Sequence, residues 1–454
     1  MSSLPRRSAA SARLPLIGHR DAGAIVAWRR GEPVTAARFL AEVAALAKAL
    51  PASGHVLNGC GDRYHFTLLL CAAIVRGQLT LLPPTTTPNV IAALRRRAPD
   101  VYAVTDDPAS RYDMPHFEWS WPAAQPARDF EVPHIEAEQV VAHVFTSGST
   151  GEPKPHVKTW GGLVADVRGE GERLGIGPGH TILGTVPPQH MYGFESTVLL
   201  PLVVGAACVA ERLYFPADID AALHAIAAPR VLFTTPFHLR AWLESGPPAK
   251  LETIVSATAP LSVPLARDAE HATGAELFEI YGCTEAGQVA TRRPTASPEW
   301  HALPGLRLWN DGAQAKCQGG HVDDETPLMD VIEPLGDGTR FLLHGRTADL
   351  VNIAGKRNSL GYLNHQLTAI PGVRDGAFFL PDEIEPDGVT RLMAFVVAPG
   401  LDAPSILAAL RQAVDPAFLP RPLVFVDRLP RQLTGKLPRE SLAALAALHR
   451  PRPS

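Results

Sequence analysis

The strongest constraint on the fold is an alternation of two hydrophobic periods along most of the chain. Short runs rich in β-branched residues favour strands, and they occupy residues 77–82, 101–105, 140–145, 230–235 and 251–257. Between them lie Ala- and Leu-rich stretches with apolar residues at three- and four-residue spacing, at 36–50, 89–98 and 218–228. Strands that alternate with helices predict a layered α/β architecture.

This pattern changes in "GRTADLVNIAGKRNSL", residues 345–360, where charges and glycines replace the periodic runs. Shorter strand-like runs follow, together with one helical stretch, "PSILAALRQAV". The sequence therefore predicts two domains, a large N-terminal α/β domain of layered sheets and helices (residues 1–348) and a small C-terminal α+β domain (349–454) that begins at Asp349.

Composition narrows the classes of partner. A formal net charge of −4 gives no electrostatic reason to expect nucleic acid or an anionic membrane surface. The longest apolar run, "FTLLLCAAIV" at 66–75, is too short to span a bilayer and predicts a buried helix. We therefore expect the protein to act on a small molecule.

Cysteine usage and the N-terminus predict a cytoplasmic protein. The five cysteines are far apart and form no C-x-x-C pair, which argues against a disulfide framework and against a zinc site. The first residues lack the apolar segment of a signal peptide. Four early arginines leave a transit peptide as an alternative, although Pro5 and Pro15 would interrupt its amphipathic helix.

A loop in "TSGSTGEPKPH", residues 146–156, suits phosphate oxygens. Glycines let backbone N–H groups converge on one point, and hydroxyl side chains and a lysine add donors. An ordinary Ser/Gly turn with a solvated lysine is the alternative. A Walker A loop is excluded because Pro155 lacks an N–H and disfavours helical geometry at Lys154, so no helix can begin there.

The longer string "FTSGSTGEPK" resembles the phosphate-binding loop of the adenylate-forming superfamily, which comprises acyl- and aryl-CoA synthetases, peptide-synthetase adenylation domains and luciferases. Further segments match that family in order. They are "PPQHMYGFESTVLLPLVVGA" (187–206), "YGCTEAG" (281–287), the spacing of Asp330 from "DG" and "GR", and "LPRQLTGKLPRE" (429–440).

The resemblance implies activation of a carboxylate by ATP, followed by displacement of AMP by a thiol. Such chemistry brings two anions together and requires positive charge and Mg²⁺, for which Glu285 is the expected ligand. The residues implied to bind ATP are Thr146, Ser147, Gly148, Ser149, Thr150, Gly151, Tyr281, Gly282, Thr284, Asp330 and Arg346. Tyr281 would stack on adenine, and Asp330 and Arg346 would hold the ribose and the nearby phosphate.

Four residues are implied to be catalytic, namely Lys154, His190, Glu285 and Lys436. By resemblance, Lys436 reaches from the small domain, acting as a mobile lid, to the α-phosphate in the first half-reaction. Asp349 is then the hinge of this lid, and Gly355 lines the tunnel through which the thiol enters. His190 would gate the acyl pocket from that tunnel.

The acid is expected to lie against "HMYGFEST", with Tyr192, Gly193, Phe194 and Ala257 lining its pocket. The aromatic wall favours an aryl, hydroxybenzoate-like acid. Glu195 offers an alternative, because amino-acid-activating relatives carry an acidic residue after an aromatic here to pair with the α-ammonium. A fatty acid is a further alternative.

The thiol acceptor is either CoA or the phosphopantetheine of an acyl carrier protein. The family's glycine after the loop lysine is Pro155 here, and the segment before Asp330 is shortened. The short chain also resembles the compact aryl-acid ligases of aryl-polyene and xanthomonadin-type pigment pathways. A non-catalytic nucleotide-binding relative is the rival from another class.

Overall fold

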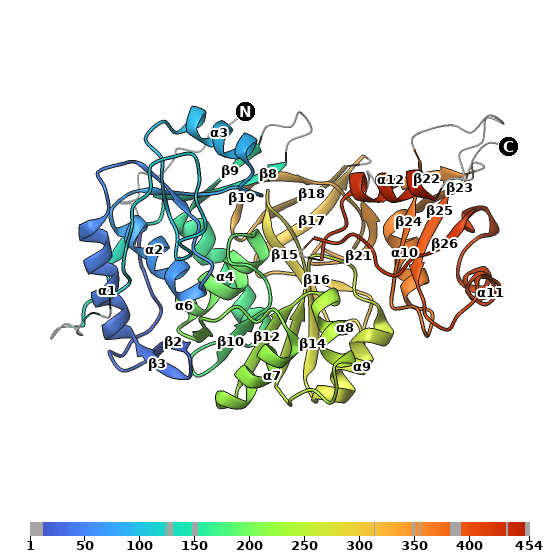
Figure 1. Ribbon diagram of the computed structural model, residues 1–454, viewed down its shortest axis with the longest axis horizontal. Coiled ribbons are helices and arrows are strands. Elements are labelled where there is room, and N and C mark those ends of the chain that lie inside the picture. Colours follow the sequence, from blue (N-terminus) through green and yellow to red (C-terminus); the bar gives the residue numbers. More distant parts are fainter. Residues whose placement is uncertain are drawn as a thin grey trace.

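A computed structural model describes residues 12–122, 124, 130–147, 153–312, 314–346, 350–353, 356–381, 392–432 and 435–449. Within these residues no helix has both the length and the apolar character needed to cross a bilayer. Figure 1 shows the chain running from the N-terminal elements at one end of the molecule to the C-terminal elements at the other.

A five-stranded sheet forms the N-terminal part, in the order β6-β4-β5-β8-β9. Its strands are β4 (His55–Asn58), β5 (Leu79–Leu82), β6 (Tyr102–Val104), β8 (Val140–Ser147) and β9 (Pro153–Thr159). The first four run parallel and β9 is antiparallel to β8. A short ribbon of β1 (Arg13–Pro15) and β7 (His134–Glu136) lies beside it.

An eleven-stranded sheet forms the centre, in the order β20-β21-β16-β15-β14-β13-β12-β10-β11-β2-β3. Its strands are β2 (Ile25–Arg29), β3 (Glu32–Thr35), β10 (Thr181–Gly184), β11 (Ala207–Val209), β12 (Arg230–Thr234), β13 (Thr253–Ser256), β14 (Glu276–Cys283), β15 (Gly287–Arg292), β16 (Trp300–Ala302), β20 (Asp330–Leu335) and β21 (Arg340–Arg346). The strands from β14 to β2 in this order are parallel, and the rest pair antiparallel. A meander of β17 (Leu306–Asp311), β18 (Gln314–Gly319) and β19 (Val322–Leu328) is attached.

One hydrophobic core joins these two sheets. Its helices are α1 (Ala36–Ala49), α2 (Arg63–Val75), α4 (Trp160–Leu174) and α6 (Leu200–Val204), with the π-helix η1 (Phe194–Leu199). The expected core helix is confirmed in α2, whose residues 66–74 are all buried. Because α4 begins directly after β9 and packs on β15, it connects the two sheets across this core.

A second core covers the other face of the parallel strands. Its helices are α7 (Pro216–Ala225), α8 (Pro236–Glu244) and α9 (Val263–Thr273), which lie beside β12 and β14 in the lower part of Figure 1. The remaining N-terminal helices are α3 (Pro88–Arg97) and the single turn α5 (Met191–Gly193). Helices on both faces of a parallel sheet confirm the expected α/β class.

The C-terminal elements have cores of their own. They comprise the ribbon of β22 (Leu350–Ile353) and β23 (Lys356–Ser359), then α10 (Leu360–Thr368), β24 (Asp375–Phe379), β25 (Met393–Val397), α11 (Ala403–Ala413), the 3-10 turn η3 (Pro416–Phe418), β26 (Leu423–Phe425) and α12 (Arg439–Leu448). They are drawn in orange and red in Figure 1. Separate cores are what the predicted α+β domain requires, while the proposed boundary at Asp349 lies outside the described residues.

Candidate active site

The loop that suits phosphate closes a β-hairpin. β8 and β9 pair antiparallel, with Thr146 opposite Lys154 and Ser147 opposite Pro153. Lys154 is exposed and extended, as expected from the proline that follows it. The helix that follows begins only at Trp160, which confirms that this is not a Walker A loop. Gly148, Ser149, Thr150 and Gly151 lie outside the described residues.

The segment "YGCTEAG" forms a second hairpin turn, between β14 and β15. Cys283 pairs with Gly287, which has φ +77°, and the register shifts between Tyr281 and Gly282. A Cβ at Gly282 would lie 2.5 Å from the Gly287 carbonyl oxygen, so only glycine fits this bulge. Thr284 and the exposed Glu285 therefore project from a rigid turn.

Two side chains of β9 connect these hairpins. The Lys158 ammonium donates to the Thr284 carbonyl oxygen at 2.7 Å. His156 hydrogen-bonds Thr146 Oγ1 through Nε2 at 2.9 Å, and the same nitrogen lies 3.7 Å from Glu285 Oε1. Burial lowers the pKa of His156, with Glu285 opposing this shift and the Lys158 and Lys154 charges adding to it. His156 thus lies between the Thr146 hydroxyl of the first hairpin and the Glu285 carboxylate of the second.

Tyr281, on the interior strand β14 of the central sheet, contacts Asp330 on the edge strand β20. The Tyr281 hydroxyl donates to Asp330 Oδ2 at 2.8 Å, and its buried ring packs edge-on against Trp300 and Phe341. Asp330 begins β20 and pairs with Arg346 at the end of β21. The antiparallel register therefore places the two residues expected at the ribose opposite each other, beside the aromatic expected at adenine.

Lys436 acts electrostatically on His190, although the two residues are far apart in the sequence. His190 lies half-buried at the N-terminus of α5, and Lys436 is exposed on the loop before α12. Burial, the Lys436 charge and the Arg212 charge lower the pKa of His190 to about 4. The His190 imidazole is therefore neutral at pH 7 and has a cation for a neighbour.

In the segment expected to line the acyl pocket, Tyr192 and Gly193 lie in α5, and Phe194 begins a π-helix, a conformation that is rare and often marks functional sites. The Tyr192 hydroxyl donates to the Val255 carbonyl oxygen at 2.9 Å, which holds its ring near Ala257 at the carboxyl end of β13. A Cβ at Gly193 would lie 2.0 Å from the Pro187 oxygen, so glycine is required there. Phe194 has no exposed surface and packs edge-on against Phe66, so it supports this segment from within the core.

A cluster of buried carboxyl groups lies behind this segment. Asp166 and Glu170 of α4 and Glu195 of η1 are each at most 2% exposed. The Gln288 amide donates to Glu170 Oε2 at 2.7 Å and to Ser196 Oγ at 3.2 Å. Burial, aided by Asp166, raises the pKa of Glu195 well above its ordinary range. Sequence patterns gave no sign of this cluster, because its carboxyl groups come from two separate helices and their amide partner Gln288 comes from β15.

We expect Glu170→Gln to remove a pH dependence of stability. Burial raises the pKa of Glu170 to about 8 from an ordinary 4.5, so the folded state retains a proton that the unfolded state loses. The stability due to this proton is present below pH 4.5 and is lost as the pH rises through 8. Between pH 5.5 and 8.5 the unfolding free energy of the unaltered chain should fall by about 3 kcal/mol more than that of the variant.

Denaturant unfolding at several pH values measures this difference. Glu172→Gln is the matched control, because Glu172 is exposed on the same helix. Equal pH profiles for the unaltered chain and Glu170→Gln would contradict the assignment of the retained proton to Glu170.

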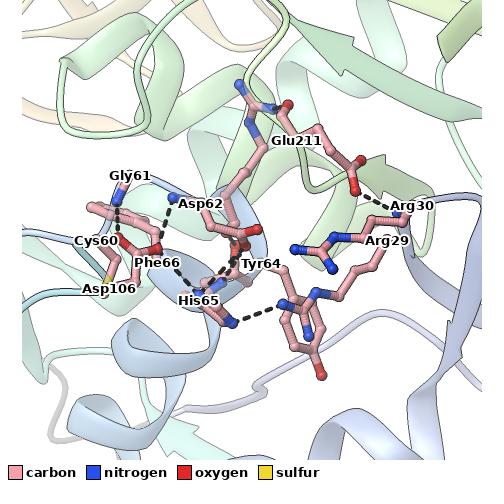
Figure 2. Close-up of polar contacts among 12 residues, drawn as sticks. Arg29, Arg30, Cys60, Gly61, Asp62, Tyr64, His65, Phe66, Asp106 and Glu211 are labelled. Carbon is pink, nitrogen blue, oxygen red and sulfur yellow. Dashed lines mark hydrogen bonds and ion pairs between the residues drawn. The ribbon is translucent and has the colours of Figure 1, made fainter. Parts of the chain in front are cut away.

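A second group of ionisable side chains lies at the N-terminus of α2 (Figure 2). Ligand atoms of Asp62, His65 and Asp106 lie within 4.8 Å of one another, a spacing that a metal ion tolerates. However, His65 Nε2 contacts an Arg29 guanidinium nitrogen at 2.8 Å, and arginine only donates. His65 Nε2 therefore accepts and Nδ1 donates to Asp106 at 3.1 Å, while Asp62 caps the helix. These contacts explain the group as a set of side chains that stabilises the N-terminus of α2.

The structure does not describe the side chains of the remaining predicted residues. Asp349 and Gly355, expected at the hinge and the thiol tunnel, lie outside the described residues. Ser147 and Arg346 are located only by their strands. Two side chains that touch the site were not predicted, namely Lys158 and His156. Their alternation with Lys154 along one strand was the available signal, since residues two apart share a face.

An α/β protein with two hairpins linked through Lys158 and His156, and with a lysine of its C-terminal elements acting on His190, has features expected of a nucleotide-dependent ligase. The comparisons agree with this class. Residues 49–316 match the profile of the AMP-binding enzyme family, and the chain belongs to this family.

Individual relatives extend the comparison. The chain is 31% identical over 318 residues to a 4-coumarate–CoA ligase of Rhodobacter capsulatus, a match covering 68% of this chain and 77% of that protein. It is also 31% identical over 348 residues to an isonitrile lipopeptide synthase of Streptomyces coeruleorubidus, covering 67% of this chain and 23% of that protein. The fold resembles ATP-bound MatB from Rhodopseudomonas palustris, with a TM-score of 0.79, 18% identity and coverage of 94% and 96%.

Proposed function

We propose that the protein activates an aryl carboxylic acid as its acyl-adenylate with ATP and then transfers the acyl group to a phosphopantetheine thiol. The observation that carries this proposal is a set of three interactions between distant segments. His156, beside Thr146, lies 3.7 Å from Glu285, Tyr281 contacts Asp330, and the Lys436 charge acts on His190. These are the groups that adenylate formation requires, namely phosphate donors, a carboxylate for metal and a mobile cation.

The residues at the hairpins fit the handling of ATP phosphates. Lys154 supplies a positive charge, and Thr146 and Thr284 supply hydroxyls. Glu285 is 43% exposed at the tip of its turn, and its carboxylate is the hard oxygen ligand that Mg²⁺ prefers. Mg²⁺ bound there with the phosphates would neutralise their charge. Lys436 would stabilise the negative charge that develops on the α-phosphate as the carboxylate attacks and pyrophosphate leaves.

The acyl side of the site favours an uncharged aryl group. Tyr192 packs edge-on against Phe233 and is held by Val255, which gives a rigid aromatic wall. Glu195 is the alternative ligand for an amino acid, but burial and the neighbouring Asp166 raise its pKa, which disfavours the charged carboxylate that would pair with an ammonium group. The 4-coumarate–CoA ligase among the relatives acts on an aryl acid by its name, which supports the same choice.

ATP–pyrophosphate exchange across hydroxybenzoates, cinnamates, fatty acids and amino acids tests the proposal. We expect exchange with aryl acids, and little with phenylalanine. Absence of exchange with every acid would favour a non-catalytic nucleotide-binding protein. Strong exchange with an amino acid would instead favour an amino-acid-activating enzyme in which Glu195 pairs with the ammonium group of the substrate.

The acceptor needs a second assay. The adenylate formed with the best acid is offered to CoA and to a holo acyl carrier protein, and the thioester is measured. Either acceptor is compatible with the proposal, since both end in the same phosphopantetheine arm. Failure of both would leave adenylation without thioester formation and would contradict the second half of the proposal.

A further inference from the structure

The loop that carries Lys436 is held by one arginine. Arg431 donates to both carboxylate oxygens of Asp375, from Nε at 2.8 Å and from Nη2 at 2.7 Å. Its remaining terminal nitrogen, Nη1, donates to the Gly435 carbonyl oxygen at 2.9 Å. That carbonyl belongs to the peptide bond joining Gly435 to Lys436. The guanidinium therefore links a β-strand of the C-terminal part to the backbone on which the lysine stands.

The loop is also closed on itself. The Gln432 N–H donates to the Lys436 carbonyl oxygen at 2.8 Å, and the Gly435 N–H donates to the Gln432 carbonyl oxygen at 2.8 Å. Gly435 has φ +78°, a conformation that favours glycine. With both ends of this turn bonded, the contact from Arg431 fixes the direction in which the Lys436 side chain leaves the loop.

The loop that carries Lys436 rests on α8, a helix that covers the central sheet. A Cβ at Gly435 would lie 3.4 Å from Thr235 Oγ1 and 3.5 Å from Phe237 Cβ, so the glycine rests on the start of this helix. One turn later, Arg240 donates to the Val373 carbonyl oxygen at 3.2 Å, just before the strand that carries Asp375. The described C-terminal part thus contacts α8 both through the loop that carries Lys436 and through the residues before β24.

We propose that Arg431, held by Asp375, is a positioning residue that orients Lys436 for adenylate formation when the C-terminal elements lie on α8. This inference rests on the proposed function. Arg431 and Asp375 are 17% and 22% exposed, so the pair is partly shielded from solvent and its bidentate geometry is restrictive. Lysine cannot replace this arginine, since one ammonium cannot provide two parallel bonds to the carboxylate and a third to the carbonyl.

The rates of adenylate formation and of thiol transfer, measured separately, distinguish a positioning role of Arg431 from a merely structural one. In Arg431→Lys we expect kcat for adenylate formation to fall by about 10- to 100-fold with little change in KM for ATP, because the lysine is displaced but the nucleotide site is intact. Thiol transfer from supplied acyl-adenylate should change by less than about twofold, since Lys436 acts only in the first step. Asp375→Asn should show the same division. Arg428→Lys, an exposed arginine of the same loop, is the matched control.

A double-mutant cycle provides the decisive comparison. Arg431→Lys should have no further effect on adenylation in a Lys436→Ala background, because a positioning residue has nothing left to position. An additional loss in that background, an equal fall in both half-reactions, or unchanged adenylation in Arg431→Lys would each overturn the proposal. Absence of adenylation in the unaltered chain would instead count against the proposed function. The assays use 4-hydroxybenzoate and 4-coumarate as probe acids.

Discussion

Lys436→Ala is expected to lower the rate of adenylate formation by about 10²- to 10³-fold, the range observed when a charge-stabilising donor is removed from a transition state. Lys436 is exposed, lies near His190 and is carried by a loop seated on α8. Since the fold does not depend on an exposed side chain, the melting temperature should be unchanged. ATP–pyrophosphate exchange measures the loss.

Lys250→Ala serves as the control for this prediction. Lys250 is also exposed, and it donates to the Ala272 carbonyl oxygen in the region of α9, away from the hairpins. Exchange that survives Lys436→Ala at the unaltered rate would refute the catalytic role of this lysine and, with it, the role of the C-terminal part as a lid. Loss in both variants would show an effect of charge rather than of position.

Arg63→Met is expected to lower the free energy of unfolding by about 3 to 5 kcal/mol. The Arg63 side chain is buried at the start of α2, and it donates to Thr197 Oγ1 and to several backbone carbonyl oxygens. The carbonyl acceptors are those of Gly184, Val186, Val209 and Glu211. Methionine fills a similar volume but leaves these buried acceptors without a donor.

Denaturant unfolding of the full chain, followed through the transition of its N-terminal part, measures this loss of unfolding free energy. Arg76→Met is the control. Arg76 is exposed at the C-terminal end of the same helix, and its replacement should change stability by about 0.5 kcal/mol or less. Equal stability of Arg63→Met and the unaltered chain would show that the acceptors find other donors. Burial lowers the pKa of Arg63, and the nearby Cys208 and Asp62 oppose this shift.

Local sequence was sufficient for most individual elements. The strand expected at 140–145 is observed as β8 and the helix expected at 36–50 as α1, because hydrophobic period and turn residues act over short distances. The extended path of Lys154 also followed from Pro155 alone. The antiparallel strands from β15 to β21 were not predicted, since their polar, short segments carry a weak period.

Long-range contacts at the site could not be predicted in this way. Lys158 and Thr284 are 126 residues apart, and Arg431 and Asp375 are 56 apart. Nothing local distinguishes Lys158 from a solvated charge. The identities of Tyr281, Asp330 and Lys436 were predicted only through the order of family motifs, and their roles remain predictions.

The sequence by itself determined the α/β class and, through Pro155, the exclusion of a Walker A loop. These depend on backbone preferences and hydrophobic period, which act within a few residues. Tertiary structure alone decided which hairpins face each other, that Glu195 lies in a buried carboxyl cluster, and that Arg431 holds the peptide bond before Lys436. Such contacts depend on the order of the strands in each sheet and on the packing between the cores. Burial then shifts the pKa of groups such as Glu195.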